Sequence, residues 1–209
     1  MACSLDCDHP PCKSKKVGMM GIVGSMVIIL GTFMAMLSYP GYSMAMWVSE
    51  LGNTIVNSGA TVFNLFLMIG GGILLFFPAA FAATTKSKIL SIGIIMGGAA
   101  AAIGTILVGV NPISFDPVLH EASAAIAFIG MALVSACMML AIFQSGGDHV
   151  PIAFAFVSAI QLSLSILYII IRVTMYATGT FIAAATFVEW FTVISFVSGT
   201  MCLAIYEVV

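Results

Sequence analysis

Acidic and histidine side chains occur at only a few places in this chain, and these residue types could carry acid–base chemistry or bind a metal ion. Asp116 and His120 are four residues apart, the spacing of two ligands on one face of a helix. The adjacent Glu121 points about 100° away from His120 on a helix, so these two side chains would not serve one ion from a single face. No HExxH, GxSxG or HxxxH motif is present. His120 could equally be an interfacial residue facing water, and the pattern assigns no catalytic step.

A second group of potential metal ligands lies near the N-terminus. Cys3, Cys7, His9 and Cys12 place three thiols and one imidazole within ten residues, and such soft donors suit zinc. Their spacing is not that of a known zinc finger. Free thiols in a disordered cytoplasmic tail, or reversible lipidation beside the lysines that follow, fit the same residues. The sequence leaves these three interpretations open and contains no motif for any other cofactor.

The composition predicts a chain that resides in a membrane. Of its 209 residues, 62% are hydrophobic and only 7% are charged, whereas a soluble domain carries about 25% charged residues. So few polar side chains could not cover a water-soluble globule of this size. The net charge of −2 and the lack of a basic stripe with interleaved aromatic residues exclude nucleic acid as a partner.

The apolar residues form six runs long enough to span a bilayer, which takes about 20 residues per helix. Strands are not expected, because every backbone polar group within a lipid span must find its partner inside the segment. The sequence therefore predicts an all-α six-helix bundle over residues 17–209, preceded by a Cys-rich, basic tail over residues 1–16. The expected spans are 17–38, 58–83, 89–110, 117–143, 151–173 and 181–206.

The basic residues predict how the chain is oriented. Three lysines precede the first span, and Lys86 and Lys88 separate the second span from the third. With six spans these five residues fall on one side, which the positive-inside rule makes cytoplasmic, while Arg172 falls near the opposite face. The first span has no clear cleavage site and is read as an uncleaved helix. We therefore expect a cell-membrane protein with both termini in the cytoplasm.

Small residues mark where helices should pack closely. Gly93 and Gly97 form a small-xxx-small pair, and Gly104 follows an alanine run in the same span. This pattern predicts that the helix over 89–110 is central to the bundle. In the second span, Gly70–Gly72 permit either close packing or a local break, of which we favour packing, and Pro78 is expected to kink the helix.

Polar side chains at depth in the membrane need an explanation, because an ionisable group at the bilayer centre costs roughly 2.5–3.5 kcal/mol. At about 1.5 Å per residue, Glu189 lies roughly 12 Å and Asn64 roughly 9 Å below the outer ends of their helices. Tyr168 falls near the level of Glu189, with Arg172 one turn nearer the outside. These residues, with others from the outer loops, predict one polar pocket in the outer third of the membrane. Its candidate residues are Glu50, Asn53, Asn64, Asp116, His120, Glu121, Tyr168, Arg172 and Glu189.

Several of these residues also have purely structural interpretations. Asp116 precedes a proline and fits the N-cap of a helix. Glu189 and Arg172 could be an ion pair that makes both charges tolerable in the membrane. The amides of Asn64 and Gln161 could hold helices together by hydrogen bonds. The sequence alone leaves these alternatives open.

The outer-loop motifs resemble those of a known membrane family. The segment Trp47-Val-Ser-Glu-Leu-Gly-Asn53, followed by Phe63-Asn64 and then Gly70-Gly71, resembles the S-x-L-G … F-N … G pattern of the prokaryotic family called domain of unknown function 998. The stretch from Gly104 to Asn111-Pro112, with His120 after it, resembles that family's second signature. The resemblance covers nearly the whole chain after Lys16 and extends remotely to six-helix proteins of the DRAM and SFK type, some of whose relatives are associated with lipid handling. It implies a six-helix bundle with functional interest at Ser49, Glu50, Gly52, Asn64 and His120, and it implies no reaction.

Three functions remain open at this point. We favour binding or processing of a lipid or another amphiphile in the outer-leaflet pocket, with Arg172 meeting a phosphate. A small proton- or ion-coupled transporter would use Glu189, Arg172 and His120, but the inner half offers few polar residues beyond Gln161. A structural or assembly subunit would use the Gly and Ala faces for partners. Membrane lipid is the expected partner, and the sequence assigns no ligand, reaction or oligomeric state.

Overall fold

The structure is a computed structural model that describes residues 15–147 and 150–208. This part of the chain is helical and contains no strand. Its elements in chain order are α1 (Lys15–Leu37), the 3-10 helix η1 (Val48–Gly52), α2 (Ala60–Leu74), α3 (Phe77–Ala83), α4 (Lys88–Val110), α5 (Pro117–Ser145), α6 (Ala153–Thr178) and α7 (Ile182–Val208).

Six spans in the described residues are long and apolar enough to cross a membrane, with α2 and α3 together forming the second. The prediction of an all-helical bundle with six such helices is therefore confirmed. The second span is interrupted near the expected kink, since α2 ends at Leu74 and α3 begins at Phe77, while Leu75 and Phe76 between them keep right-handed helical dihedral angles. Pro78 lies in the first turn of α3. A proline is tolerated there because the first N–H groups of a helix have no partner within it, but its ring and its missing N–H prevent α2 from continuing regularly into α3. The helix α6 extends to Thr178, beyond the expected end at Val173, and stops where Gly179 takes a left-handed conformation with φ 71°.

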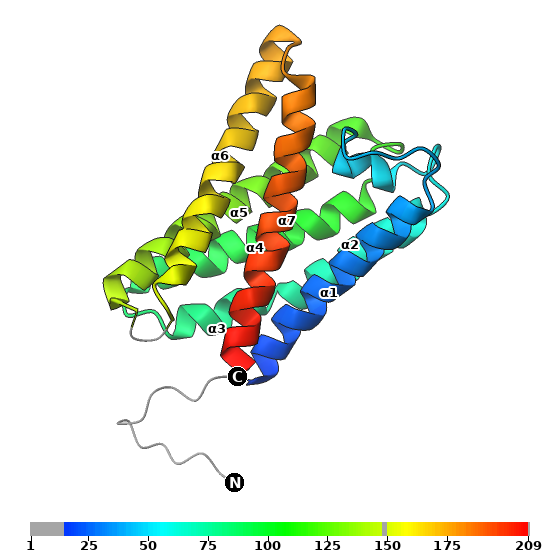
Figure 1. The fold of residues 1–209 in the computed structure, drawn as a ribbon. Coiled ribbons are helices and arrows are strands. Elements are labelled where there is room, and N and C mark those ends of the chain that lie inside the picture. Colours follow the sequence, from blue (N-terminus) through cyan, green and yellow to red (C-terminus); the bar gives the residue numbers. More distant parts are fainter. Residues whose placement is uncertain (1–14, 148–149, 209) are drawn as a thin grey trace.

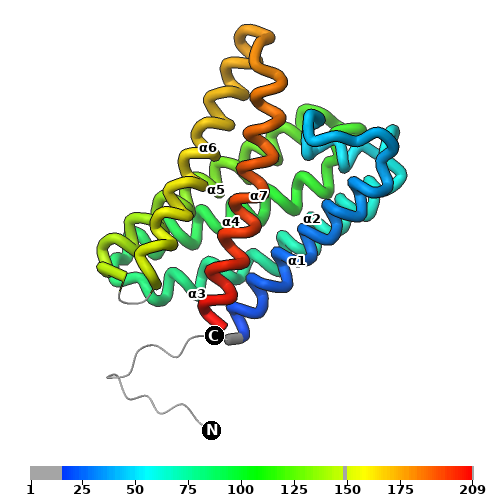
Figure 2. Tube along the Cα trace, in the orientation of Figure 1, coloured from blue at the N-terminus to red at the C-terminus, as the bar shows by residue number. Residues whose placement is uncertain are grey.

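The long helices form one closed ring. Each packs against two neighbours, in the order α1, α2, α4, α5, α6, α7 and back to α1, as Figures 1 and 2 let the reader follow. The expectation that the helix over 89–110 is central was wrong: α4 is one wall of the ring, and its most extensive contact is with α5. No long helix among the described residues occupies the axis of the ring.

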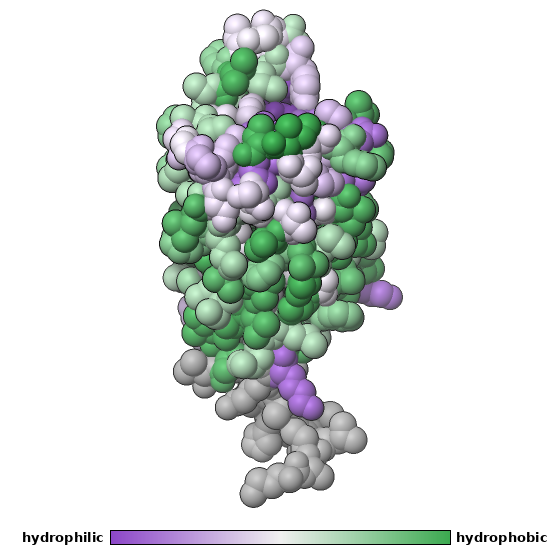
Figure 3. Space-filling model, turned by 90° about the vertical axis from the view of Figure 1, so that its right-hand side faces the viewer, coloured by the Kyte–Doolittle hydropathy of each residue, from purple (hydrophilic) through white to green (hydrophobic). Residues whose placement is uncertain are grey.

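The two ends of the bundle differ in what they carry. Residues 38–59, called the cap segment below, lie at one end with the α4–α5 and α6–α7 connections (Figure 1). We call this the cap end. The opposite end, called the terminal end, holds the start of α1, the end of α7 and the α3–α4 connection. Figure 3 shows apolar side chains covering the middle of one face, with polar ones gathered toward the cap end, as suits a multi-pass membrane protein.

Close contact between α4 and α5 depends on glycine. A Cβ atom on Gly104 would lie 2.3 Å from the backbone nitrogen of Ala127, and one on Gly130 would lie 2.3 Å from that of Ala101. Gly72, by contrast, has open space where a Cβ would stand. Of the three neighbouring glycines in the second span, Gly70 and Gly71 therefore serve packing and Gly72 does not.

This difference predicts opposite effects of the same substitution at two helical glycines. Gly104→Ala should lower the free energy of unfolding by about 1–3 kcal/mol, because the new methyl group forces two backbones apart. The control Gly72→Ala should leave it unchanged or raise it by up to ~1 kcal/mol through better helix propensity. Thermal unfolding in detergent, followed by circular dichroism, measures both. Equal midpoints for the two variants would contradict the close approach of α4 and α5.

Candidate functional site

The ring surrounds a cavity of about 130 Å³. All the helices contribute to its wall. It extends from Glu189 near the cap end to Leu203 near the terminal end, and both residues belong to α7. At 1.5 Å per residue this separation is about 21 Å along the helix. The cavity is therefore long and narrow and runs most of the length of the bundle.

The cavity wall is mostly apolar. Phenylalanine, leucine, valine and methionine side chains supply most of it, including Phe63, Phe128, Met131 and Phe196. Ser135 also faces the cavity, but its hydroxyl donates to the carbonyl of Met131 in its own helix at 2.7 Å. Such a lining favours a hydrocarbon occupant over a hydrated one.

Five polar residues line the cavity toward its cap end: Thr32, Ser49, Thr105, His120 and Glu189. The hydroxyls of Thr32 and Thr105 donate to carbonyls of their own helices, at 2.8 Å each. His120 is only 3% exposed, so the alternative of a water-facing interfacial residue was wrong. Its Nδ1 lies 2.8 Å from the carbonyl oxygen of Asn111, which can only accept a hydrogen bond. Nδ1 therefore donates, and in the neutral ring Nε2 is an acceptor with no hydrogen-bond partner among the described residues.

Glu189 holds the cap segment with one carboxylate oxygen. Its Oε2 accepts a hydrogen bond from the backbone N–H of Val48, at the start of η1, at 3.1 Å. The neighbouring Trp190 donates from Nε1 to the carbonyl of Met46 at 3.0 Å. Oε1 of Glu189 accepts no hydrogen bond from the described chain. This buried side chain therefore fastens the cap segment with one oxygen and leaves the other without a partner in the described chain.

Two asparagine amides, one on α2 and one within the cap segment, hold this segment in place by hydrogen bonds. Asn64 on α2 donates from Nδ2 to the carbonyl of Gly52 at 3.1 Å. Asn57 donates to the carbonyl of Leu51 at 2.7 Å and accepts from the backbone N–H of Gly59 at 2.9 Å. Leu51 itself is fully buried. Asn64 thus joins a long helix to the cap segment, whereas the sequence had suggested a bond between two long helices.

Tyr42 adds a further hydrogen bond within the cap segment. Its hydroxyl donates to the carbonyl of Trp47 at 3.1 Å, and its ring meets the edge of Trp190 at a centroid distance of 6.1 Å. Burial raises the pKa of Tyr42 above its ordinary value of 10, and the charge of Glu189 raises this pKa further. The hydroxyl therefore stays protonated and available as a donor at neutral pH.

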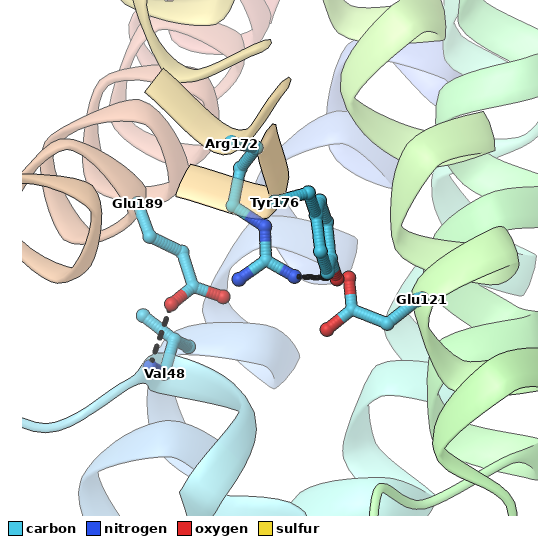
Figure 4. Close-up of polar contacts among 5 residues, drawn as sticks. All are labelled: Val48, Glu121, Arg172, Tyr176 and Glu189. Atoms are coloured by element: carbon cyan, nitrogen blue, oxygen red, sulfur yellow. Dashed lines mark hydrogen bonds and ion pairs between the residues drawn. The ribbon is translucent and has the colours of Figure 1, made fainter. Parts of the chain in front are cut away.

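Arg172 lies beside the cavity, where it ties α6 to α5 and to the cap segment. Its guanidinium pairs with Glu121 on α5, donates to the Tyr176 hydroxyl at 2.8 Å, and lies 4.7 Å from the centre of the Trp47 ring. Figure 4 shows the guanidinium between the carboxylates of Glu121 and Glu189. The proposed Glu189–Arg172 ion pair was wrong, because the carboxylate that Arg172 contacts in the described chain is that of Glu121.

The remaining candidates take structural positions. Asp116 caps α5, accepting hydrogen bonds from two backbone N–H groups at 3.0 Å each. Glu50 and Asn53 bond to each other at 2.9 Å within the cap segment. Tyr168 is buried against Phe128 at a centroid distance of 4.1 Å. None of these four predicted residues lines the cavity.

Five of the predicted residues thus lie in three different settings rather than in one pocket. Glu189 and His120 line the cavity; Arg172 and Glu121 form the neighbouring ion pair; Asn64 holds the cap segment. Sequence reasoning missed Trp47 and Trp190, which take part in the same contacts, as do Tyr42 and Asn57. The aromatic residues of the cap segment were an available signal for Tyr42 and Trp47, whereas Trp190 lies within the apolar run of α7 and Asn57 had no such signal.

No metal site emerges from the described part of the chain, where no three His, Cys, Asp or Glu side chains gather to hold an ion. The predicted ligands Cys3, Cys7, His9 and Cys12 lie outside the described residues. No known protein family, curated protein or solved structure matches the chain.

The contact between Gly52 and Asn64 makes a testable pair. A Cβ on Gly52 would lie 2.5 Å from Oδ1 of Asn64, so Gly52→Ala should displace the amide and lower the free energy of unfolding by about 1–3 kcal/mol. In an Asn64→Ala background the same change should cost less, with a coupling of about 0.5–3 kcal/mol. Thermal unfolding of the four proteins, with hydrogen exchange over residues 48–52, measures this. Strictly additive effects would show that the two residues do not meet.

Proposed function

We propose that this chain is a multi-pass protein of the cell membrane that binds a single-chain amphiphile in its central cavity. The terminal end faces the cytoplasm in this proposal. Lys16, Lys86 and Lys88 lie at that end, and Arg172 lies toward the opposite one. This distribution satisfies the positive-inside rule.

The shape of the cavity is the observation that carries the proposal. Divided by its length of about 21 Å, the cavity volume of about 130 Å³ gives a mean cross-section of roughly 6 Å². This is the area that the centre of a water-sized sphere can reach. Adding the ~1.4 Å radius of that sphere gives a channel about 2.8 Å in radius. Carbon atoms pack at about 3.5–4.0 Å from one another, so one extended hydrocarbon chain fits this width, and two chains or a fused ring do not.

The length of the cavity suits a lipid tail as well. The hydrocarbon core of a bilayer is about 30 Å thick, so one leaflet accounts for about 15 Å of it. A channel of about 21 Å is long enough for a chain of that kind. The apolar wall would replace the lipid surroundings of the chain, and the polar residues near the cap end would meet its headgroup.

The unpaired acceptors indicate the chemistry of the headgroup. Oε1 of Glu189 and Nε2 of His120 have no partner in the described chain, and each can accept a hydrogen bond when the carboxyl group is ionised and the imidazole is neutral. They complement a headgroup that donates, such as a hydroxyl or an amine. A phosphate headgroup on Arg172 is no longer favoured, because that guanidinium already contacts Glu121, Tyr176 and Trp47 and does not line the cavity.

The alternatives drawn from the sequence find less support. An ion-coupled transporter would need polar or ionisable groups through the inner half of the bundle. The cavity there is lined mainly by apolar side chains such as Phe77, Phe81 and Leu203. An assembly subunit would have no use for an internal cavity with unpaired acceptors. The resemblance to the family with domain of unknown function 998 stays a prediction and is compatible with amphiphile binding.

Substitution of the two acceptors tests the proposal. Glu189→Gln keeps an oxygen for the N–H of Val48 but turns an acceptor toward the headgroup into a donor, and His120→Ala removes Nε2. Each should weaken binding of hexadecylamine, whose ammonium headgroup can only donate, at least about tenfold, which is roughly 1.4 kcal/mol. Binding of 1-hexadecanol should fall less in Glu189→Gln, because a hydroxyl can also accept from the new amide. Native mass spectrometry of the detergent-solubilised protein with added ligand measures the bound fraction.

The matched control is Glu50→Gln, which alters a carboxylate of the cap segment that does not line the cavity. It should bind both compounds as the wild type does. Hexadecyl phosphate should bind less well than the alcohol to the wild-type protein, because the two acceptors repel its charge. Unchanged binding in both Glu189→Gln and His120→Ala would overturn the site, as would a preference for the phosphate.

A further inference from the structure

Gln161 places an unpaired amide deep in the apolar cavity. This residue of α6 is 7% exposed and its side chain lines the cavity. A Cβ on Gly199 would lie 3.7 Å from Oε1 of Gln161, which locates the amide beside α7. Within the described part of the chain the amide has no hydrogen-bond partner, although it offers an acceptor and two donors.

An unpaired amide in these surroundings needs an explanation. Buried polar side chains are nearly always hydrogen-bonded, because leaving one unpaired is unfavourable. A bond between helices, which the sequence suggested for Gln161, is not what the structure contains. Ser158, one turn earlier on α6, also lines the cavity, and its hydroxyl has no hydrogen-bond partner among the described residues either. With Thr200, which also lines the cavity beside Gly199, the two side chains form a polar position in a mostly apolar wall.

The depth of this position follows from α7. Gly199 lies beside the Gln161 amide and is about 15 Å along the helix from Glu189. An extended chain advances roughly 1.2 Å per bond, so about twelve bonds separate a headgroup at Glu189 from a group at Gln161. We infer that the preferred ligand carries a second polar group, a hydroxyl or carbonyl, about twelve bonds from its headgroup, where Gln161 binds it. This inference rests on the proposed amphiphile site.

Two probes that differ by one hydroxyl test the inference. Wild-type protein should bind 1,12-octadecanediol at least about tenfold more tightly than 1-octadecanol, because only the diol satisfies the Gln161 amide. Gln161→Met keeps the length of the side chain and removes the amide. It should bind 1-octadecanol as well as the wild type does and lose the preference for the diol. Competition between the two compounds in native mass spectrometry gives the ratio directly.

A structural role for Gln161 predicts a different pattern. Without ligand, Gln161→Met should unfold at the wild-type temperature or above it, because an unpaired buried amide has been removed. A clear fall in its unfolding temperature would overturn the inference, and so would equal binding of diol and mono-alcohol by the wild type, which would mean that water alone satisfies the amide. Failure of the wild type to bind either compound would instead contradict the amphiphile site itself.

Discussion

The central cavity exists because the six long helices pack in one ring and leave the axis to side chains alone. Helices pack at about 8–10 Å from each other, and in a regular ring of six the axis is as far from each helix as its neighbours are. Side chains must therefore fill the space along the axis that a seventh helix could occupy. Where α4 and α5 approach through Gly104 and Gly130, the wall is tight. Along the axis the side chains meet incompletely, and a narrow apolar channel remains.

Closing this channel at one end requires polar backbone to be buried, and this requirement explains many of the polar side chains nearby. Apart from η1, the cap segment is irregular, so its buried N–H and C=O groups need side-chain partners. Glu189, Trp190, Asn64 and Asn57 supply them from the helices and from the segment itself. The charges next to the cap obey the same constraint: Arg172 is tolerated at 13% exposure because a carboxylate and aromatic rings surround it.

With Arg172 used in this way, no lysine or arginine side chain of the described chain lines the cavity. This inverts the interpretation drawn from residue types, in which a buried arginine pointed to a phosphate. In the proposed function, carboxylate and imidazole acceptors would select for donors and against anions. Gln161, farther along the channel, adds a position that can both donate and accept. If the proposed ligand binds, the spacing of these groups along the channel would make selectivity depend on the length of its chain as well as on its headgroup.

The sequence by itself determined the helical class, the six apolar spans and the capping of α5 by Asp116, because these depend on local composition and on neighbours in the chain. It also identified most of the polar residues near the cap, since a charge in an apolar run is conspicuous wherever it points. Only the tertiary structure decided that Arg172 pairs with Glu121 and that Glu189 holds Val48. Helical rise gives the height of a side chain but not its direction or its partner. Those depend on how the helices rotate and close into a ring, which is settled by contacts between residues far apart in the chain.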